Sequence, residues 1–301
     1  MPSRPTHSPW IRLLAGWAAA VAVCAAAAWP THGQTVNYSG SLQYATGSYL
    51  FAERTHSVYL FNGLDLSHGR LQAAVSLPVI YQSSPWVSYT VVGSVPSGGP
   101  QQGAVGGRGS GNGSGDGGGP GSGRRRGGDP IVVPDTATYA DIGVGDPSLR
   151  ADLTLLRGTT GPTMRLAGSA KAPVADVDRG FGTGAWDAGL GLSLAQRLGR
   201  WFLFGEALHW WLGDMDDLTL QNTVSYSASL GRVFQNGRLG VLASFSGYTE
   251  IIDAAAPPLQ TALGLNYQFG GGAYSLSATA SAGLSESVPD VSVSLGWRVT
   301  L

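Results

Sequence analysis

The chain has 301 residues, of which 46 are glycine, and only 12% of its residues are charged. Soluble enzymes of this size carry roughly twice that share of charged residues, so the composition disfavours a helix-rich soluble enzyme. The formal net charge is −1. Because nucleic-acid-binding domains are strongly basic, we expect no nucleic-acid partner.

The first 33 residues are typical of a secretory signal peptide. Arg4 and Arg12 form a basic start, and an apolar run extends from Leu13 to Ala28. We expect cleavage near residue 28 or 33, which leaves residues 34–301 as a single domain. A retained transmembrane helix is the alternative, although the run is at the short end for spanning a bilayer.

Cys24 is the only cysteine and lies within this segment. The mature chain is therefore expected to have no disulfide and no thiol chemistry.

From Gln34 onward, apolar and polar residues alternate in segments of about ten residues, the length of a tilted strand that crosses an outer membrane. We assign about twelve strands, an even number as bacterial barrels of this type have. The assigned strands are Thr35–Tyr44, Thr55–Asp65, Arg70–Gln82, Asp141–Arg157, Thr163–Val174, Gly184–Leu198, Trp201–Leu212, Leu218–Phe234, Arg238–Ile251, Leu259–Phe269, Ala273–Leu284 and Asp290–Leu301. The fold class predicted is all-β, a transmembrane antiparallel β-barrel of the outer-membrane type.

The connections between these strands alternate in length. Short turns that contain glycine lie at residues 66–69, 158–162, 199–200, 235–237 and 270–272. With the amino terminus in the periplasm, every short turn is periplasmic and every longer loop is external, as outer-membrane barrels have them.

On the strands that alternate most regularly, every second residue is uncharged. We predict that this set of alternate residues, the outward parity, faces lipid, because an Arg or Lys that faces lipid at the midplane costs about 2 to 4 kcal/mol. The other parity is polar and faces the lumen. Its charged members include Arg150, Asp152, Arg165, Lys171, Asp187 and Arg298. They either line a path for a small solute or form a structural ion-pair network that plugs the barrel.

The segment Trp201–Leu212 has bulky residues at both parities. Glu206 near its middle would be costly in lipid, so we place it inward. That choice puts Phe204, Leu208 and Trp210 in the lumen as well. They are interpreted either as an apolar track for aromatic cargo or as side chains that fill space.

Two prolines and one insert interrupt this pattern. Pro78 and Pro147 would each remove a hydrogen bond of the sheet, so we expect bulges or kinks at both.

Residues 97–128 are roughly half glycine and are expected to be a disordered insert in an external loop. Its arginine cluster at residues 124–126 indicates either an adhesive or phosphate-binding arm or a tolerated linker.

The final strand alternates up to Leu301 and resembles the carboxy-terminal assembly signal of outer-membrane barrels. Gly296 and Val299 match that signal, and Leu301 stands where a terminal Phe is usual. The partners expected from this resemblance are outer-membrane lipids and the barrel-assembly machinery.

Three short motifs together resemble the outer-membrane family named for the MetA pathway of phenol degradation. The matching residues are Gly143, Gly145, Asp146 and Leu149, then Lys171, Ala172 and Pro173, then Gly182, Thr183, Gly184 and Asp187. Val174 and Ala175 replace a Thr-Gly pair of the family motif. The resemblance implies an outer-membrane transporter or channel for small hydrophobic or aromatic compounds.

Two other classes of function remain open. One is a structural or adhesive barrel without transport. The other is an outer-membrane hydrolase, for which the candidates are His209 with Asp214, Asp216 and Asp217, since a histidine beside a carboxylate can activate water. No cysteine or histidine cluster has metal-ligand spacing, and no glycine-rich loop joins a strand to a helix, so neither a metal nor another cofactor is expected.

Overall fold

The computed structural model describes residues 33–90, 92–97, 105, 139–158, 161–216, 218–253 and 255–301. The predicted signal segment and glycine-rich insert lie outside the described residues, apart from residues 33, 97 and 105. Within the described part of the chain, no helix is long and apolar enough to cross a membrane.

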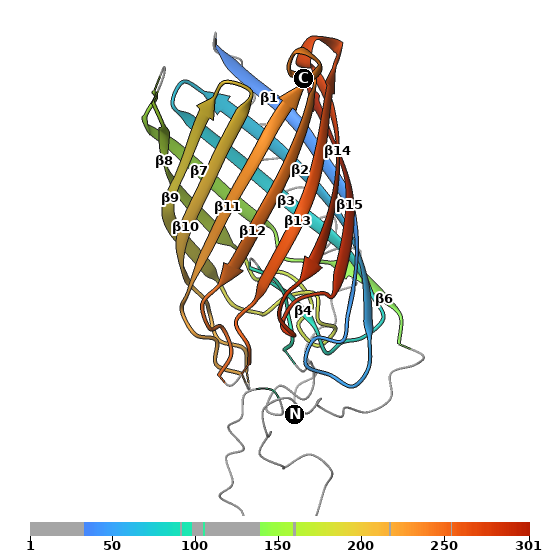
Figure 1. The fold of residues 1–301 in the computed structure, drawn as a ribbon. Coiled ribbons are helices and arrows are strands. Elements are labelled where there is room, and N and C mark those ends of the chain that lie inside the picture. The colour runs from blue at the N-terminus through green and yellow to red at the C-terminus, as the bar shows by residue number, and fades with distance from the viewer. Residues whose placement is uncertain are drawn as a thin grey trace, which may run out of the picture.

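The described residues form a closed antiparallel barrel (Figure 1). Its strands are β1 (Gln34–Gly47), β2 (Thr55–His68), β3 (Leu71–Gln82), β6 (Asp141–Val144), β7 (Ser148–Leu156), β8 (Thr163–Lys171), β9 (Asp187–Leu198), β10 (Trp201–Trp211), β11 (Thr223–Phe234), β12 (Leu239–Tyr248), β13 (Leu259–Phe269), β14 (Tyr274–Gly283) and β15 (Val291–Thr300). The sheet has 13 strands, and β6 and β7 pair in succession with β3, so the wall is twelve strands around. Pairing of β1 with both β15 and β2 closes the cylinder. The predicted fold class is confirmed.

The segment predicted as one strand, Asp141–Arg157, is two strands separated by a bulge. Residues 145–147 lie opposite only two residues of β3, because Val144 pairs with Val79 and Ser148 pairs with Ser76. The extra residue reverses the side-chain parity, so that both Ile142 and Leu149 are exposed. The bulge expected at Pro147 is therefore present.

The bulge expected at Pro78 is absent. Pro78 pairs with Phe61 of β2 in unbroken register. Its carbonyl oxygen accepts the Gly145 N–H at 2.9 Å, so the edge of Pro78 without an N–H faces the irregular segment between β6 and β7. No hydrogen bond of the β2–β3 ladder is lost, which explains why β3 runs through.

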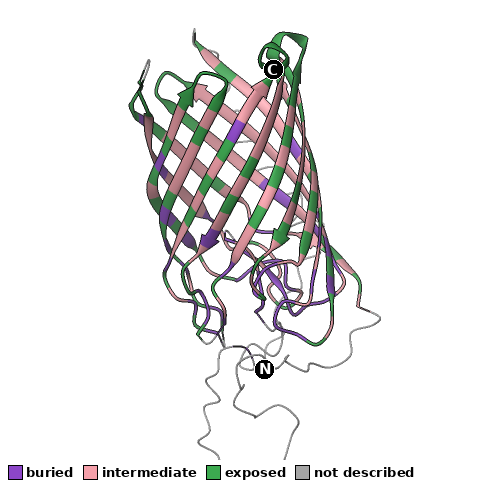
Figure 2. Ribbon diagram, in the orientation of Figure 1, coloured by how far each residue is buried: buried purple, intermediate pink, exposed green. Residues whose placement is uncertain are grey.

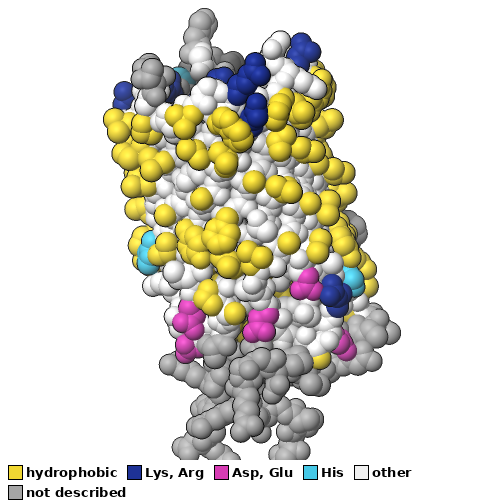
Figure 3. Space-filling view, viewed as in Figure 1, with side chains coloured by type: hydrophobic (Ala, Val, Ile, Leu, Met, Phe, Trp, Pro, Cys, Tyr) yellow, Lys and Arg dark blue, Asp and Glu magenta, His cyan; other side chains and the backbone are white. Residues whose placement is uncertain are grey.

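The outer wall carries the parity predicted to face lipid. Leu153, Leu190, Leu265 and Leu276 are exposed, with 43% to 54% of their surface accessible. In Figure 2, exposed residues alternate with less exposed ones along the strands of this wall. In Figure 3, the same wall carries a broad band of apolar side chains. Large aromatic side chains lie near both edges of the wall, among them Tyr44, Tyr81, Trp186, Trp201, Trp211, Tyr267 and Tyr274, as interfacial girdles do.

Several predicted strands were too long at their external ends. β11 begins at Thr223 and β12 ends at Tyr248. The alternating apolar residues beyond these ends, including Leu218, Leu220, Ile251 and Ile252, leave the sheet and pack together over the external mouth of the barrel. Local alternation cannot distinguish these loops from strands, because both bury every second side chain.

A short hairpin inside the external half of the barrel was not predicted. Strands β4 (Ser88–Thr90) and β5 (Gly93–Val95) pair with each other and with no strand of the wall. At the opposite end, the 3₁₀ turns η2 (Gln235–Gly237) and η3 (Gly270–Gly272) make two of the short connections.

Candidate functional site

A buried polar cluster lies at the external end of the lumen, where β7, β8 and β9 begin or end. The Lys171 Nζ is 2.9 Å from Asp146 Oδ2 and 3.1 Å from Asp187 Oδ2. It also donates a hydrogen bond to Thr183 Oγ1. The Lys171 side chain is only 1% exposed, so the ammonium exchanges its hydration for these oxygens.

This cluster ties two external loops to the wall. The second oxygen of Asp146 accepts the backbone N–H groups of Val174 and Ala175, each at 2.8 Å. Asp187 accepts the N–H of Gly213 at 3.0 Å. The loops that follow β8 and β10 therefore depend on the same buried charges for their position.

Gly182 is required by close approach to this cluster. A Cβ at Gly182 would lie 2.5 Å from Asp146 Oδ2 and 2.8 Å from the Cβ of Ala175. We expect Gly182→Ala to lower the free energy of unfolding by about 1 to 3 kcal/mol. Urea titration of the protein in lipid vesicles measures this loss. At Gly168 a Cβ meets only carbonyl oxygens at 3.9 and 4.0 Å, so an equal loss in Gly168→Ala would contradict the packing argument.

A second charged group lies deeper in the lumen. Arg150 of β7 contacts Asp152 through two hydrogen bonds of 2.8 and 2.9 Å. It also reaches Glu206 of β10, with Nη1 at 3.3 Å from Oε1. The Arg150 side chain is 37% exposed and the carboxylates are less exposed. The group is therefore a partly exposed network of three charged side chains within the lumen.

The other charged candidates lie apart from this group. Arg165 lies opposite Thr154 and Ser193 in the sheet register, and its Nε is buried without a partner. Arg298 is an exposed residue of β15, and it lies near the end of the barrel opposite to Lys171. The candidates thus fall into the Lys171 cluster, the Arg150 group and two separate arginines.

The two aromatic candidates on β10 are separated by Glu206. Trp210 is buried in the apolar cluster at the external mouth, with Leu208, and its Nε1 donates to Ser225 Oγ at 2.9 Å. Phe204 lines a different cavity of about 380 Å³ nearer the short turns, with Phe202 and Leu242. Both side chains face inward, but they do not form one continuous apolar track.

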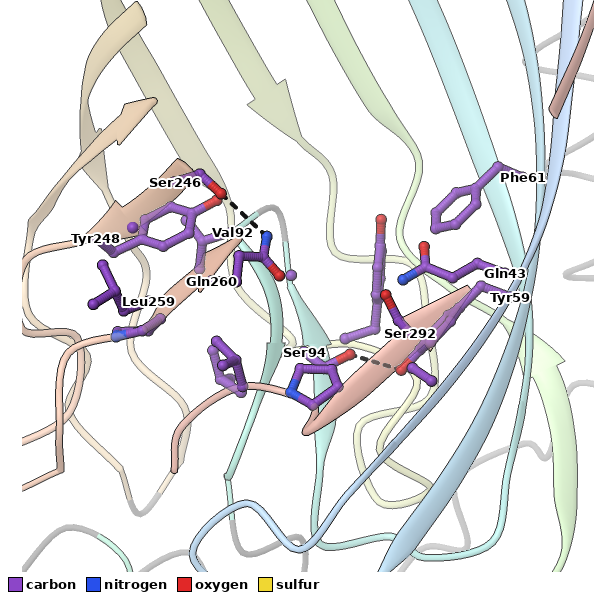
Figure 4. A pocket seen from close by; sticks show the side chains of 18 residues that line it. Gln43, Tyr59, Phe61, Val92, Ser94, Ser246, Tyr248, Leu259, Gln260 and Ser292 are labelled. Atoms are coloured by element: carbon purple, nitrogen blue, oxygen red, sulfur yellow. Dashed lines mark hydrogen bonds between the residues drawn. The ribbon is translucent and has the colours of Figure 1, made fainter. Parts of the chain in front are cut away.

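A cavity of about 300 Å³ lies between the β4–β5 hairpin and the wall (Figure 4). Three rings line one side of it. The centroids of Tyr59 and Tyr89 are 5.6 Å apart, those of Phe61 and Tyr89 are 5.9 Å apart, and those of Tyr59 and Phe61 are 6.0 Å apart. Such spacings are those of interacting aromatic rings.

Polar groups mark the rest of this cavity. The Tyr59 hydroxyl shares a 2.6 Å hydrogen bond with Ser94 Oγ, which fixes the hairpin to β2. Gln260 donates to Ser246 Oγ at 3.3 Å on the far side. Burial raises the pKa of the Tyr89 hydroxyl above its ordinary value, so this ring stays neutral. The cavity is suited to a small uncharged ligand with an apolar body.

Two solved structures with the same architecture are an outer-membrane channel and a porin. An outer-membrane channel from Pseudomonas putida F1 has a TM-score of 0.61 and 14% identity, covering 90% of this chain and 97% of that chain. The NanC porin has a TM-score of 0.50 and 8% identity, covering 88% of this chain and 100% of that chain. This chain has the fold of an outer-membrane β-barrel. No protein-family model and no curated protein matches it.

The functional residues that sequence reasoning missed lie mostly in or against the hairpin. Tyr59 and Phe61 have the inward parity of β2 and were identifiable from alternation alone. Tyr89 was not, because its strand has three residues. Asp146 and Thr183 were noted only as parts of motifs, and no local signal showed that they meet Lys171.

The hydrolase candidates do not assemble into a catalytic site. His209 is exposed, on the opposite face of β10 from Trp210, and its ring lies 4.7 Å from that of Trp211 in an edge-to-face contact. Asp214 accepts the Leu220 N–H at 2.9 Å within its own loop. Among the described residues, no hydrogen bond or ion pair joins His209 to Asp214 or Asp216, and Asp217 lies outside the described residues.

Proposed function

We propose that this protein is an outer-membrane channel for small solutes, and that its preferred solutes are uncharged compounds with an aromatic or other apolar body. The observation that carries the proposal is the cavity inside a closed barrel, lined by Tyr59, Phe61 and Tyr89. Its volume is at the lower end for small-molecule sites. A single aromatic ring is the class of ligand that such a space and such a lining favour.

The charged groups complement this preference. Arg150, Asp152 and Glu206 place both signs of charge in the same section of the lumen. Mixed charges do not select strongly for one sign of ion. Solutes without net charge are therefore not repelled by the charged side chains in this section of the lumen.

We also propose membership of the MetA-pathway family that the motifs resemble. The support is that residues of all three motifs, which lie at 143–149, 171–173 and 182–187, meet in the one cluster of Asp146, Lys171, Thr183 and Asp187. On this proposal the first 33 residues are a signal peptide, the barrel-assembly machinery inserts the chain, outer-membrane lipids surround it, and it has no enzymatic activity.

A barrel without transport is the second candidate, and a specific observation favours it. The apolar cluster around Trp86, Trp210, Met215 and Ile251 fills the external mouth. For solutes to pass, these loops have to move aside while the wall stays closed.

Planar-bilayer recording separates the two candidates. We expect the refolded protein to produce discrete current steps in potassium chloride. Silence under these conditions, together with liposomes that do not swell in small sugars, would favour the structural barrel.

Filling the cavity should weaken binding of aromatic compounds. Ser246→Trp places an indole in the space beside Gln260, and we expect at least about tenfold weaker binding of phenol, about 1.4 kcal/mol. Isothermal titration of the detergent-solubilised protein measures it. Ser244→Trp is the matched control, one step deeper on the same face of β12 and not part of the cavity lining. Equal phenol affinity in wild type and Ser246→Trp would contradict the assignment of this cavity.

A further inference from the structure

Among the residues that the structure describes, the two rims of the barrel carry opposite charge. The five short connections between wall strands are residues 69–70, 157–162, 199–200, 235–238 and 270–273. Four of them contain an arginine and none contains Asp or Glu; the arginines are Arg70, Arg157, Arg200 and Arg238. The external loops 48–54, 172–186, 212–222, 249–258 and 284–290 carry only Arg54 and Arg179 as bases. Their described acids are Glu53, Asp176, Asp178, Asp214, Asp216, Glu250, Asp253, Glu286 and Asp290.

The same polarity is visible on the surface in Figure 3. Arginine side chains gather beyond the apolar band at the end where the carboxy terminus lies, and most acidic side chains gather at the other end. Because the short turns of outer-membrane barrels are periplasmic, the basic rim lies at the level of the periplasmic leaflet.

One arginine of this rim lies on the lipid-facing wall itself. Arg232 shares the parity of Leu230 and Phe234, which are 46% and 38% exposed. Its guanidinium carbon lies 5.2 Å from the ring centre of Trp201 and 5.1 Å from that of Phe234. The group is therefore held between two aromatic rings of the interfacial girdle.

Arg200 and Arg238 flank this position. Arg232 pairs with Trp201 in the β10–β11 register, and the Arg200 carbonyl accepts the Val233 N–H at 2.9 Å. Arg238 follows η2 and precedes Leu239, which pairs with Phe234. Arg200, Arg232 and Arg238 thus lie close together along the rim, at the ends of β10, β11 and β12, and Arg200 and Arg238 are exposed.

The position of Arg232 and its ring contacts indicate which class of ligand this part of the rim binds. The Nε of Arg232 is buried and makes no hydrogen bond. A planar guanidinium matches two oxygens of a phosphate, and Arg232 as a whole residue is only partly buried. At this depth the phosphates available in a bilayer are those of phospholipid headgroups.

We propose that Arg200, Arg232 and Arg238, with Trp201 and Phe234, form a binding site for the headgroup of an anionic phospholipid in the periplasmic leaflet. The site holds the lipid phosphate at the wall between β10 and β12. This inference is independent of the solute that the lumen conducts. It assigns a function to the arginines of the turns, which the lumen does not use.

Native mass spectrometry of the detergent-solubilised full chain tests the site. The measured quantity is the ratio of bound phosphatidylglycerol to bound phosphatidylcholine at equal lipid concentrations. We expect wild type to prefer phosphatidylglycerol, Arg232→Gln to lower that preference about fivefold, and the triple change R200Q/R232Q/R238Q to lower it roughly a hundredfold. Arg232→Lys keeps the charge without the planar fork, so a smaller loss than in Arg232→Gln is expected.

Two controls make the result specific. Arg70→Gln with Arg157→Gln removes two arginines from the same rim at another part of the wall, and a change below about twofold is expected, because each basic group acts only over its local surface. Arg200 and Arg238 are exposed residues of turns, so we expect Arg200→Gln and Arg238→Gln to leave the fold intact. An equal loss in the Arg70 and Arg157 control, or no preference for phosphatidylglycerol in wild type, would overturn the proposal. Displacement of the lipid by inorganic phosphate, beyond that caused by chloride at equal ionic strength, would assign the site to a free anion instead.

Discussion

Lys171→Met is expected to lower the free energy of unfolding by about 3 to 5 kcal/mol, because it leaves buried carboxylates without their counter-charge. Asp146 and Asp187 both lie within 3.1 Å of the Lys171 ammonium and are at most 1% exposed. Urea titration in lipid vesicles, followed by tryptophan fluorescence, measures the loss. Neutralising the carboxylates as well, with Asp146→Asn and Asp187→Asn, should recover part of it.

An exposed ion pair provides the control for this experiment. Arg54 Nη2 lies 2.8 Å from Asp290 Oδ2, with the two side chains 52% and 41% exposed. Since solvated pairs contribute about 0 to 1 kcal/mol, Arg54→Gln should change stability little. If Lys171→Met and Arg54→Gln had equal effects, the buried cluster would not be what fixes the two external loops.

Leu265→Arg is expected to destabilise the protein in a bilayer by about 2 to 4 kcal/mol, the cost of an arginine that faces lipid near the midplane. Leu265 is 50% exposed on the outer wall near the middle of β13. The measurement is the free energy of folding into vesicles.

The neighbouring residue is a matched control. Asn266 has the opposite parity and pairs with Gly240 and Ser277 on the lumenal face. Asn266→Arg should therefore cost less than about 1 kcal/mol, because the new charge stays in water. A similar loss from both substitutions would indicate that β13 does not separate lipid from lumen.

The wall of this barrel was predictable from sequence because alternation is a local signal. Each strand from β8 to β15 was identified, and at the short-turn end of the barrel its predicted end lies within one residue of the observed end. The parity change at Pro147 was visible for the same reason: Ile142 and Leu149 cannot both be outward on one regular strand.

The contents of the lumen were not predictable in this way. The β4–β5 hairpin has strands of three residues and no repeating pattern, and its position depends on contacts such as Tyr59 with Ser94, 35 residues apart. In the Lys171 cluster, Lys171 contacts Asp146, which lies 25 positions before it in the sequence. Inward parity identified Lys171, Arg150 and Glu206 singly, but which of them meet is set by the three-dimensional closure of the barrel.

Alternating exposure to lipid and water along one strand tests the central claim most directly. Cys24 is the only cysteine, so single cysteines along β14 can carry nitroxide labels in a Cys24→Ser background. We predict that labels at 276, 278 and 280 collide mainly with oxygen, which concentrates in lipid, and that labels at 275, 277 and 279 collide mainly with a water-soluble nickel chelate. Equal accessibility to both reagents at successive positions would contradict a closed barrel with an aqueous lumen.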